Sequence, residues 1–347
     1  MTTTIAAWGA TAPDSGIVPL TITRRDLRGD DVAITIQYCG ICHSDLHQAR
    51  NDWGNTSYPV VPGHEIVGVV AAVGADVTRY KPGDRVAVGC LVDSCLTCPS
   101  CQTHEEQYCE NRSTPTYNSR DRRDGSPTYG GYSGHIVVRE EFVLRLPEPL
   151  DMARAAPLLC AGITTYAPLR QWHVGPGSKV AVAGLGGLGH MGVKLAVALG
   201  AEVTMLTTSP EKAADAGRLG AHDVLVVTDR DAVKQAARRF DLVLDTIPVK
   251  HDLGPYLSML KTGGVLVIVG AIEPIGLHTG QIVSGRKIVT GSAIGGIAQT
   301  QEMLDLCAEK GVLPDCEMIT MDQIASAYDR LERGDVRYRF VIDMAGA

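Results

Sequence analysis

The chain has 347 residues, 45% of them hydrophobic and 20% charged, which suits roughly two domains with ordinary buried cores. Its formal net charge of −7 argues against broad electrostatic binding of nucleic acid. No apolar run approaches the ~18 residues that cross a bilayer, and the first residues lack the basic and apolar segments of a signal peptide. We therefore expect a cytoplasmic protein that binds neither nucleic acid nor membrane.

Cysteine is abundant for such a protein, with ten residues, half of them between positions 90 and 109. Thiols in a reducing compartment stay unpaired, so clustered cysteines there more often bind metal or take part in chemistry than form disulfides. The composition therefore directs attention to metal sites.

From about residue 30 to residue 150 the chain consists of short Val-, Ile- and Gly-rich runs separated by Pro-Gly turns. Runs of this kind, bounded by turn residues, are typical of β-strands. They read DVAITIQYCG, EIVGVVAAVG, DRVAVG and GHIVVREEFVLRLP. We expect a compact β-rich domain over residues 1–152.

From about residue 153 strand-like and helix-like runs alternate, beginning with KVAVAG, GGLGHMGVKLAVALG and EVTMLT. This alternation indicates βαβ units and hence a doubly wound parallel sheet of the Rossmann type, which we place at residues 153–297. Residues 298–347 contain two more helical runs and a last strand, and we expect this tail to return to the first domain.

The turn GLGGLG follows the first strand of that second domain and opens a helix. In a dinucleotide-binding turn Gly184 would make the tight bend, Gly186 would let the backbone approach a pyrophosphate, and Gly189 would allow close packing. The helix N-terminus favours the negative charge. The alternative is a glycine-rich turn in an ordinary βαβ unit.

The end of the next strand indicates which dinucleotide binds. An NAD-binding domain usually carries an acid about 20 residues after the turn, bonded to the ribose 2′-OH. Residues 203–209 contain no acid, and hydroxyls and a lysine stand nearby instead: Thr207, Thr208, Ser209 and Lys212. This favours NADP(H), whose 2′-phosphate an acid would repel. Alternatively, Thr208 and Ser209 only cap the next helix.

A compact group of four cysteines lies at residues 95–109, inside a lobe that we place at residues 90–110. Cys95, Cys98, Cys101 and Cys109 match a closed tetrahedral zinc site built from thiolates alone. Sulfur count alone also allows an iron–sulfur cluster. A site with four thiolates has no open position, so this zinc would be structural.

A second set of metal ligands is dispersed along the chain: Cys42 in CGICHSDLH, His64-Glu65 in PGHEIVG, and Cys160 in PLLCAGITTY. Two thiolates and one imidazole at a zinc ion leave a fourth position for water or substrate. Taken singly, Cys160 fits a core cysteine and His64 a turn histidine.

Together these motifs resemble the zinc-dependent medium-chain dehydrogenases over nearly the full length of the chain. The similarity is greatest to the NADP-dependent branch that includes cinnamyl-alcohol dehydrogenases and their bacterial relatives. The motifs are GICHSDLH, YPVVPGHEIVGVV, the four-cysteine lobe, GGYSGHIVV, APLLCAGITTY, GLGGLGHMGVK and GGIAQTQEML. The resemblance implies an α/β protein with a GroES-like β-rich catalytic domain and a Rossmann cofactor domain.

The resemblance also implies two zinc ions per subunit and roles for the residues around the catalytic one. Cys42, His64 and Cys160 would bind that zinc, a ligand set known from alcohol dehydrogenases. Glu65 would lie behind the metal as a transient ligand, and Asp45 would hold His64 in one tautomer.

Further roles follow from position within the family. Ser44 would contact the substrate oxygen and His47 would pass its proton to water. His43 and Arg339 would meet the cofactor pyrophosphate, and Gly187 and Leu188 would complete the dinucleotide turn. The substrate pocket would include Trp53, Cys90 and Ile294, with core packing as the alternative for Trp53.

The implied function is hydride transfer between NADP(H) and a primary alcohol or aldehyde, aromatic or medium-chain. One alternative is an NADPH-dependent reductase of conjugated C=C or iminium bonds, and a remote one is a zinc-stapled nucleotide-binding protein without turnover. The family further implies a homodimer that pairs through the segment RKIVTGSAIGG, or a tetramer.

Overall fold

The computed structural model describes residues 3–270 and 273–345 and divides the chain into two compact units. The β-rich unit contains residues 1–160 and 295–347, and the parallel-sheet unit contains residues 161–294. The first boundary lies beyond residue 152 because the short helices α3 (Met152–Ala155) and η3 (Ala156–Leu159) pack on strands of the β-rich unit. The change from strand-like to helix-like sequence near residue 153 therefore precedes the boundary between the two units.

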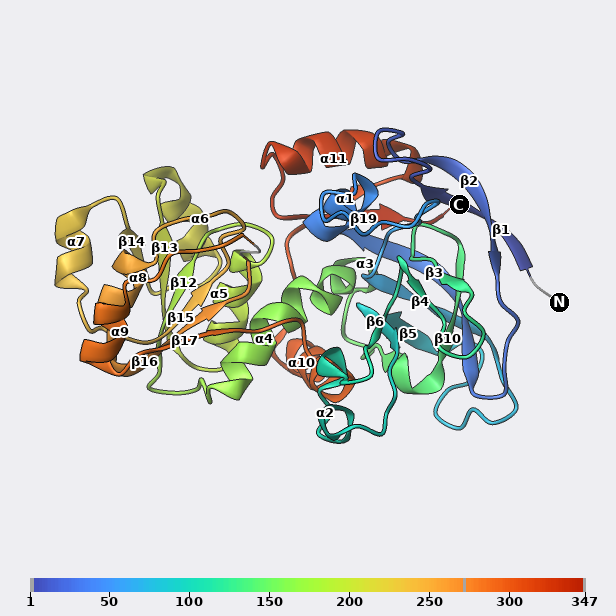
Figure 1. The fold of residues 1–347 in the computed structure, drawn as a ribbon, viewed down its shortest axis with the longest axis horizontal. Coiled ribbons are helices and arrows are strands. Elements are labelled where there is room, and N and C mark those ends of the chain that lie inside the picture. The colour runs from blue at the N-terminus through green and yellow to red at the C-terminus, as the bar shows by residue number, and fades with distance from the viewer. Residues whose placement is uncertain (1–2, 271–272, 346–347) are drawn as a thin grey trace. The chain divides into compact units, whose positions relative to one another are not determined.

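The main sheet of the β-rich unit is built around its longest strand, β3 (Asp31–Ile41). It pairs antiparallel with β4 (Ile66–Val73), β10 (His135–Arg139) and β19 (Arg339–Asp343). The sheet continues through β5 (Arg85–Val88) to β11 (Leu144–Arg145) on one side and to β18 (Cys316–Ile319) on the other. The C-terminal strands thus complete a sheet that the N-terminal part begins (Figure 1).

Smaller elements surround this sheet. Three two-stranded sheets pair β1 (Thr3–Gly9) with β2 (Val18–Arg24), β6 (Leu91–Asp93) with β7 (Thr114–Pro115), and β8 (Ser119–Arg120) with β9 (Pro127–Thr128). The helices of this unit are α1 (His43–Ala49), α2 (Pro99–Gln102), α3, α10 (Ile297–Lys310) and α11 (Ile324–Glu332).

The parallel-sheet unit has six strands in the order β14-β13-β12-β15-β16-β17. Their bounds are β12 (Lys179–Ala183), β13 (Glu202–Thr207), β14 (Asp223–Val226), β15 (Phe240–Asp245), β16 (Leu260–Ile268) and β17 (Ile288–Gly291). The helices are α4 (Ala161–Gln171), α5 (Gly189–Ala198), α6 (Ala213–Arg218), α7 (Arg230–Gln235), α8 (Gly254–Met259) and α9 (Thr279–Gly285). The strand order reverses between β12 and β15, where doubly wound folds bind ligands.

Three strand ends of the β-rich unit meet at one place. Cys39 pairs with Ile66 at the start of β4, and Ile41 pairs with Phe340 at the start of β19. The residues just beyond these pairs therefore come together, although they lie far apart in sequence: Cys42, Glu65 and Arg339. Among the described residues no helix is long and apolar enough to cross a membrane.

Candidate active site

Four side chains with metal-binding atoms meet at this junction. Cys42 is the N-cap of α1, His64 and Glu65 precede β4, and Cys160 follows the short helix η3. One ligand atom from each lies within 4.8 Å of the others, and all four residues are buried. The dispersed residues that the sequence analysis grouped are thus neighbours.

The spacing of the two sulfurs fits a zinc ion. A tetrahedral ion with Zn–S bonds of about 2.3 Å holds two sulfurs about 3.8 Å apart. The Sγ atoms of Cys42 and Cys160 lie 3.9 Å apart, far beyond a disulfide bond. Contact with Cys160 also lowers the pKa of Cys42 despite burial, which favours the thiolate that a metal needs.

Asp45 orients His64 from behind. Its Oδ1 lies 3.0 Å from His64 Nδ1 and accepts a hydrogen bond of 3.0 Å from the backbone N–H of Gly63. Its Oδ2 accepts one of 2.9 Å from the backbone N–H of Cys42. A carboxylate only accepts, so Nδ1 of His64 carries the proton and Nε2 keeps its lone pair for a metal.

Glu65 and Arg339 form a buried pair beside the ligands. The guanidinium of Arg339 is bonded to Oε1 of Glu65, while Oε2 of Glu65 is buried and has no hydrogen-bond partner among the described residues. Burial raises the pKa of Glu65 to about 8, against the opposing charge of Arg339. A buried oxygen without a partner, within the same cluster, fits an occasional fourth metal ligand.

The observed partner of Arg339 is not the one that the sequence analysis expected. We expected it at the cofactor pyrophosphate, yet it is only 4% exposed and its partner within the β-rich unit is Glu65. The pyrophosphate contact stays a prediction. His43, the other residue expected there, is exposed at the start of α1.

Two buried tyrosines extend the contacts of Asp45 further from the ligands. The hydroxyl of Tyr132 donates to Oδ2 of Asp45 over 3.3 Å, and the hydroxyl of Tyr328 on α11 donates to that of Tyr132 over 3.4 Å. A third tyrosine, Tyr117, lies with its ring centroid 5.7 Å from that of His64. Asp45 is therefore linked through Tyr132 to α11, in the C-terminal part of the chain.

The residues expected to move a proton lie on α1. Ser44 Oγ is 3.6 Å from Cys42 Sγ, and His47 follows one helical turn later with its side chain 40% exposed. Nδ1 of His47 lies 2.8 Å from a carboxylate oxygen of Asp52, a partner that the sequence analysis missed. Trp53 packs near His47, with ring centroids 5.8 Å apart, and its 40% exposure excludes plain core packing.

The remaining expected pocket residues lie in different units. Cys90 is half-buried in the β-rich unit, 3.7 Å from the carbonyl oxygen of Leu159, next to Cys160. Ile294 is the last residue of the parallel-sheet unit. Their part in a substrate pocket stays a prediction.

The four-cysteine lobe forms a second cluster, with its sulfurs within 4.8 Å of one another. Cys95 and Cys101 Sγ are 3.9 Å apart and Cys98 and Cys109 Sγ are 4.0 Å apart, again the spacing around a tetrahedral zinc. Backbone N–H groups point at these sulfurs, including that of Cys98 at 3.3 Å from Cys95 Sγ. This donor set fits a closed structural site.

The glycine turn of the parallel-sheet unit joins β12 to α5. Gly184 has φ +91°, which only glycine adopts freely, and a Cβ on Gly189 would lie 1.8 Å from the carbonyl oxygen of Gly184. A Cβ on Gly186 would meet no atom within 4 Å, so this backbone faces open space. The first and third glycines are needed by the turn itself, whereas the second leaves room for a ligand. Gly187 and Leu188 complete the turn before α5.

The end of β13 presents hydroxyls. Thr207 is buried and its Oγ1 accepts a 3.1 Å hydrogen bond from the backbone N–H of Ser209. Thr208 is exposed, and Ser209 occupies an N-cap position without a capping hydrogen bond from its side chain. The hydroxyls of Thr208 and Ser209 are thus not consumed by helix capping. Lys212 ends the next turn, and its side chain lies outside what the structure describes.

Sequence reasoning missed Asp52, Tyr117, Tyr132 and Tyr328. For Asp52 a signal existed, because it follows His47 by five residues across the end of a short helix. Tyr132 lies within the motif GGYSGHIVV, although the motif alone gave it no role, whereas Tyr117 and Tyr328 reach the site through tertiary packing.

Comparison with known proteins assigns these clusters to a class. Residues 28–148 match the alcohol dehydrogenase GroES-like domain, and residues 187–309 match the family described as zinc-binding dehydrogenase. The chain is 54% identical over 344 residues to an NADP-dependent alcohol dehydrogenase C of Mycolicibacterium smegmatis, covering 99% of this chain and 98% of that one. It is 51% identical over 344 residues to an aldehyde reductase of Escherichia coli, covering 98% of each.

Solved structures agree over the whole chain. A cinnamyl alcohol dehydrogenase of Sorghum bicolor has a TM-score of 0.96 at 46% identity, with 99% of each chain covered. A cinnamyl alcohol dehydrogenase of Helicobacter pylori complexed with NADP(H) has a TM-score of 0.93 at 39% identity, with 100% of each chain covered. The fold is that of the two-domain medium-chain dehydrogenases, a GroES-like domain and a Rossmann-type domain. The chain belongs to the zinc-binding alcohol dehydrogenase family, as its motifs predicted.

Proposed function

We propose that this protein is a zinc-dependent oxidoreductase that transfers a hydride between NADP(H) and a primary alcohol or its aldehyde, aromatic or medium-chain. The cluster of Cys42, His64 and Cys160 carries the proposal, because two thiolates and one imidazole leave a zinc position open for a substrate oxygen. The printed activities of relatives support it: NADP-dependent alcohol dehydrogenase, aldehyde reductase and cinnamyl alcohol dehydrogenase.

The residues at the cluster divide the work of holding the metal. When bound by Cys42, His64 and Cys160, zinc supplies a Lewis acid that polarises the substrate oxygen. Asp45 keeps Nε2 of His64 directed away from itself and free to bind. Glu65, whose Oε2 has no hydrogen-bond partner among the described residues, would be able to offer a carboxylate oxygen to the metal.

Ser44 and His47 carry the proton of the alcohol. Ser44 lies beside Cys42, where a hydroxyl accepts a proton from a substrate oxygen and passes on its own. At His47 the Nδ1 proton is held by Asp52, so Nε2 is the basic nitrogen. Its partial exposure then lets the proton pass to water.

NADP(H) would bind on the turn at residues 184–189, where it supplies or accepts the hydride. The open backbone at Gly186 provides N–H groups for a pyrophosphate. Thr208 and Ser209 offer hydroxyls to a 2′-phosphate, and the absence of an acid at residues 203–209 removes the group that would select NAD.

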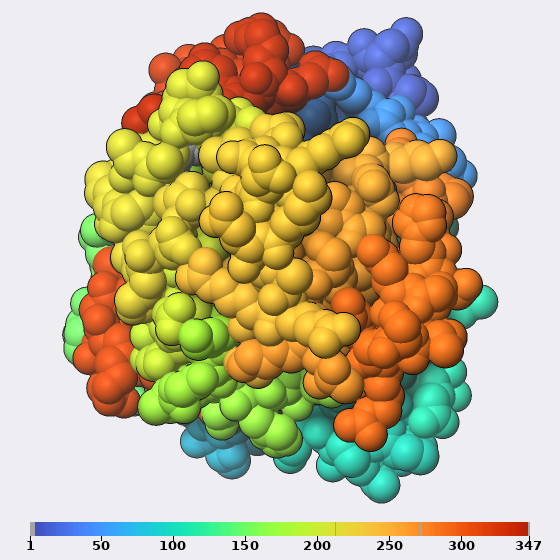
Figure 2. Space-filling view, turned by 90° about the vertical axis from the view of Figure 1, so that its left-hand side faces the viewer, coloured from blue at the N-terminus to red at the C-terminus, as the bar shows by residue number. Residues whose placement is uncertain are grey.

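The protein would act as a homodimer in the cytoplasm. Strand β17 forms one edge of the parallel sheet, and an unpaired edge can bond to the same edge of a second copy. Ile288 on this strand is an exposed apolar residue, and the orange part of Figure 2 includes this stretch of the chain. The ten free thiols suit a reducing compartment.

The test is a kcat/KM panel over benzaldehyde, cinnamaldehyde and medium-chain aldehydes, with NADPH and NADH. We expect metal-dependent oxidation of NADPH and weaker use of NADH. Product analysis with cinnamaldehyde separates reduction of the carbonyl from reduction of the C=C bond. No consumption with any aldehyde would overturn the proposal, and a preference for NADH would overturn the NADP(H) assignment.

Two cysteine variants distinguish the metal clusters. Cys42→Ser removes a ligand of the open cluster, so turnover should be lost by a factor of at least about 100 while folding persists. Cys98→Ser opens the closed cluster, so thermal stability or assembly should fall first. Metal content per subunit should drop from two to one in each variant, and full activity of Cys42→Ser would contradict the assignment.

A further inference from the structure

The β-rich unit contains a hollow that is rich in arginine and borders the four-cysteine lobe, because the backbone N–H of its lining residue Arg112 donates to the carbonyl oxygen of Cys109 over 2.9 Å. It has a volume of about 390 Å³. Arg112, Arg120 and Arg122 line it, together with Ser57, Asn118 and Ser119. No acidic residue lines it. In a chain with a net charge of −7, a hollow with three guanidiniums and no carboxylate requires an explanation.

Most arginines of this unit are paired with acids. Within the part of the chain that the structure describes, at least nine of them form ion pairs with a carboxylate: Arg25, Arg28, Arg50, Arg85, Arg123, Arg139, Arg145, Arg330 and Arg339. By contrast, the side chains of Arg112, Arg120 and Arg122 contact no carboxylate among the described residues, and all three are exposed. Their positive charge is therefore not neutralised by any of the described carboxylates.

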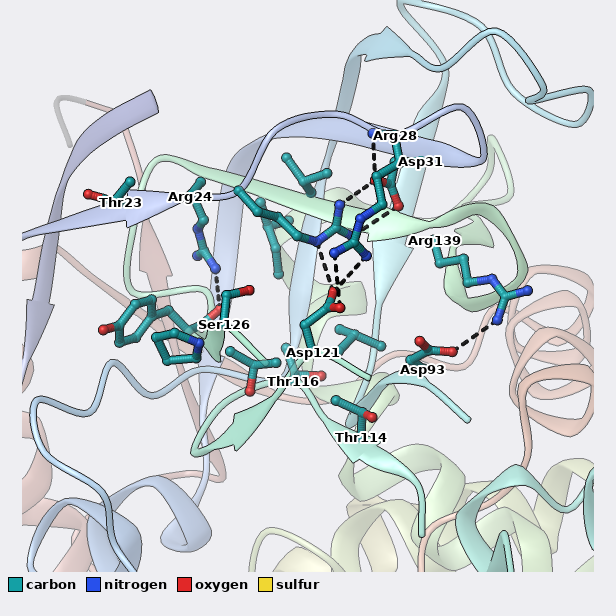
Figure 3. Close-up of a pocket in the computed structure, with 17 residues that line it drawn as sticks. Thr23, Arg24, Arg28, Asp31, Asp93, Thr114, Thr116, Asp121, Ser126 and Arg139 are labelled. Atoms are coloured by element: carbon teal, nitrogen blue, oxygen red, sulfur yellow. Dashed lines mark hydrogen bonds and ion pairs between the residues drawn. The ribbon is translucent and has the colours of Figure 1, made fainter. Parts of the chain in front are cut away.

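In an adjacent pocket of the same unit, arginine side chains are paired with carboxylates. It shares Thr114, Pro127, Thr128 and Tyr129 with the hollow. There the guanidinium of Arg28 faces the carboxylate of Asp121, as Figure 3 shows. Acidic residues therefore line the adjacent pocket, whereas none lines the hollow, although the two share these four residues.

The free arginines are nevertheless held in place. Nη1 of Arg122 donates to the carbonyl oxygens of Asn111 and Arg112 over 3.0 and 2.6 Å, and Nη1 of Arg120 donates to that of Gly125 over 3.0 Å. These bonds use one nitrogen of each guanidinium and leave the others available. The hydroxyls of Ser113 and Ser119 have no hydrogen-bond partner among the described residues either.

We infer that this hollow is a binding site for a small oxyanion carrying at least two negative charges, such as a phosphate ester or a polycarboxylate. Guanidiniums bind such groups through paired N–H donors, and a planar fork fits both carboxylate and phosphate. A volume of about 390 Å³ accommodates a small metabolite and exceeds what a lone ion fills. The site borders the four-cysteine lobe but contains none of its cysteines, and it does not depend on the proposed activity.

The test is calorimetric titration of the zinc-loaded protein with glucose 6-phosphate and, separately, with tricarballylate, at low ionic strength. Each titration is run with and without excess NADP+, so that binding at the dinucleotide turn is recognised. We expect saturable binding that persists with NADP+ and weakens as salt is added. The better ligand identifies the chemical source, phosphate ester or carboxylate.

The double variant Arg112→Gln with Arg122→Gln should weaken this binding about 100-fold, since each lost charge-assisted contact costs about tenfold. The matched control is Arg79→Gln with Arg333→Gln, which removes the same charge from exposed positions outside the hollow. Turnover should be unchanged in both. Equal binding by the two double variants, or no binding to the unchanged protein at millimolar ligand, would overturn the inference.

Discussion

At the scale of single residues, the cluster of Cys42, His64 and Cys160 depends on groups that are not themselves candidate metal ligands. Asp45 receives hydrogen bonds from two backbone N–H groups, from His64 and from Tyr132. Together these hydrogen bonds fix the position of the Asp45 carboxylate, and the fixed carboxylate in turn orients the ring of His64. The hydroxyl of Tyr328 on α11 continues this chain, so the C-terminal part of the unit takes part as well.

Tyr132→Phe should therefore weaken metal retention by up to about tenfold, because a released Asp45 holds His64 less firmly. The measurement is the rate of zinc loss to a chelator, together with the visible spectrum of the cobalt-substituted protein.

Tyr80→Phe is the matched control, since its buried hydroxyl donates to the carbonyl oxygen of Val143, outside the Asp45 network, over 2.6 Å. Both variants should lose about 1 kcal/mol of stability from a buried hydrogen bond. Equal zinc loss from the two would show that Tyr132 is only structural.

At the scale of elements, ion pairs tie the β8–β9 hairpin to the turn between β2 and β3. Arg28 pairs with Asp121 and Asp124, and Arg123 pairs with Asp30. The hairpin lies close in sequence to Tyr117, whose ring faces His64. These pairs thereby steady a segment that reaches the metal cluster.

The ion pair between Arg123 and Asp30 should make the free energy of unfolding depend on pH in the acidic range. The hydrogen bond from Arg123 lowers the pKa of Asp30 to about 2, below its unfolded value of about 3.9. The stabilisation is therefore complete above about pH 4 and is lost as pH falls towards 2. The side chains of Arg123 and Asp30 are 38% and 29% exposed, so solvent screening reduces this stabilisation to less than about 1 kcal/mol.

Urea unfolding of the unchanged protein and of Arg123→Gln measures this effect. The difference in unfolding free energy should be present at pH 6 and should shrink towards zero near pH 2.5. Arg79→Gln serves as the reference, because its guanidinium contacts no carboxylate among the described residues. A difference that stays constant over this range would contradict the assignment.

At the scale of the whole molecule, two sheets leave exposed edge strands with apolar side chains. Ile288 on β17 is 39% exposed, and Met318 on β18 is 48% exposed. Only the first edge belongs to the sheet that the proposed dimer extends.

Ile288→Lys should therefore shift the protein from dimer to monomer in sedimentation, because a charge on an edge strand opposes pairing with a second copy. Met318→Lys places the same charge on the other edge and should leave the dimer intact. A dimer that survives Ile288→Lys, or a monomeric unchanged protein, would rule out pairing through β17.

The sequence by itself determined the fold class and the family, and it predicted both clusters that could hold a metal ion and the glycine turn. These features depend on local spacing and on backbone conformations that only certain residues adopt, as at Gly184 and in the four-cysteine lobe. Tertiary structure alone decided which distant residues meet: it pairs Arg339 with Glu65 and Tyr132 with Asp45, and it gathers Arg112, Arg120 and Arg122 around one hollow. Such contacts join segments far apart in the chain, and their energy comes from burial and geometry that no local pattern records.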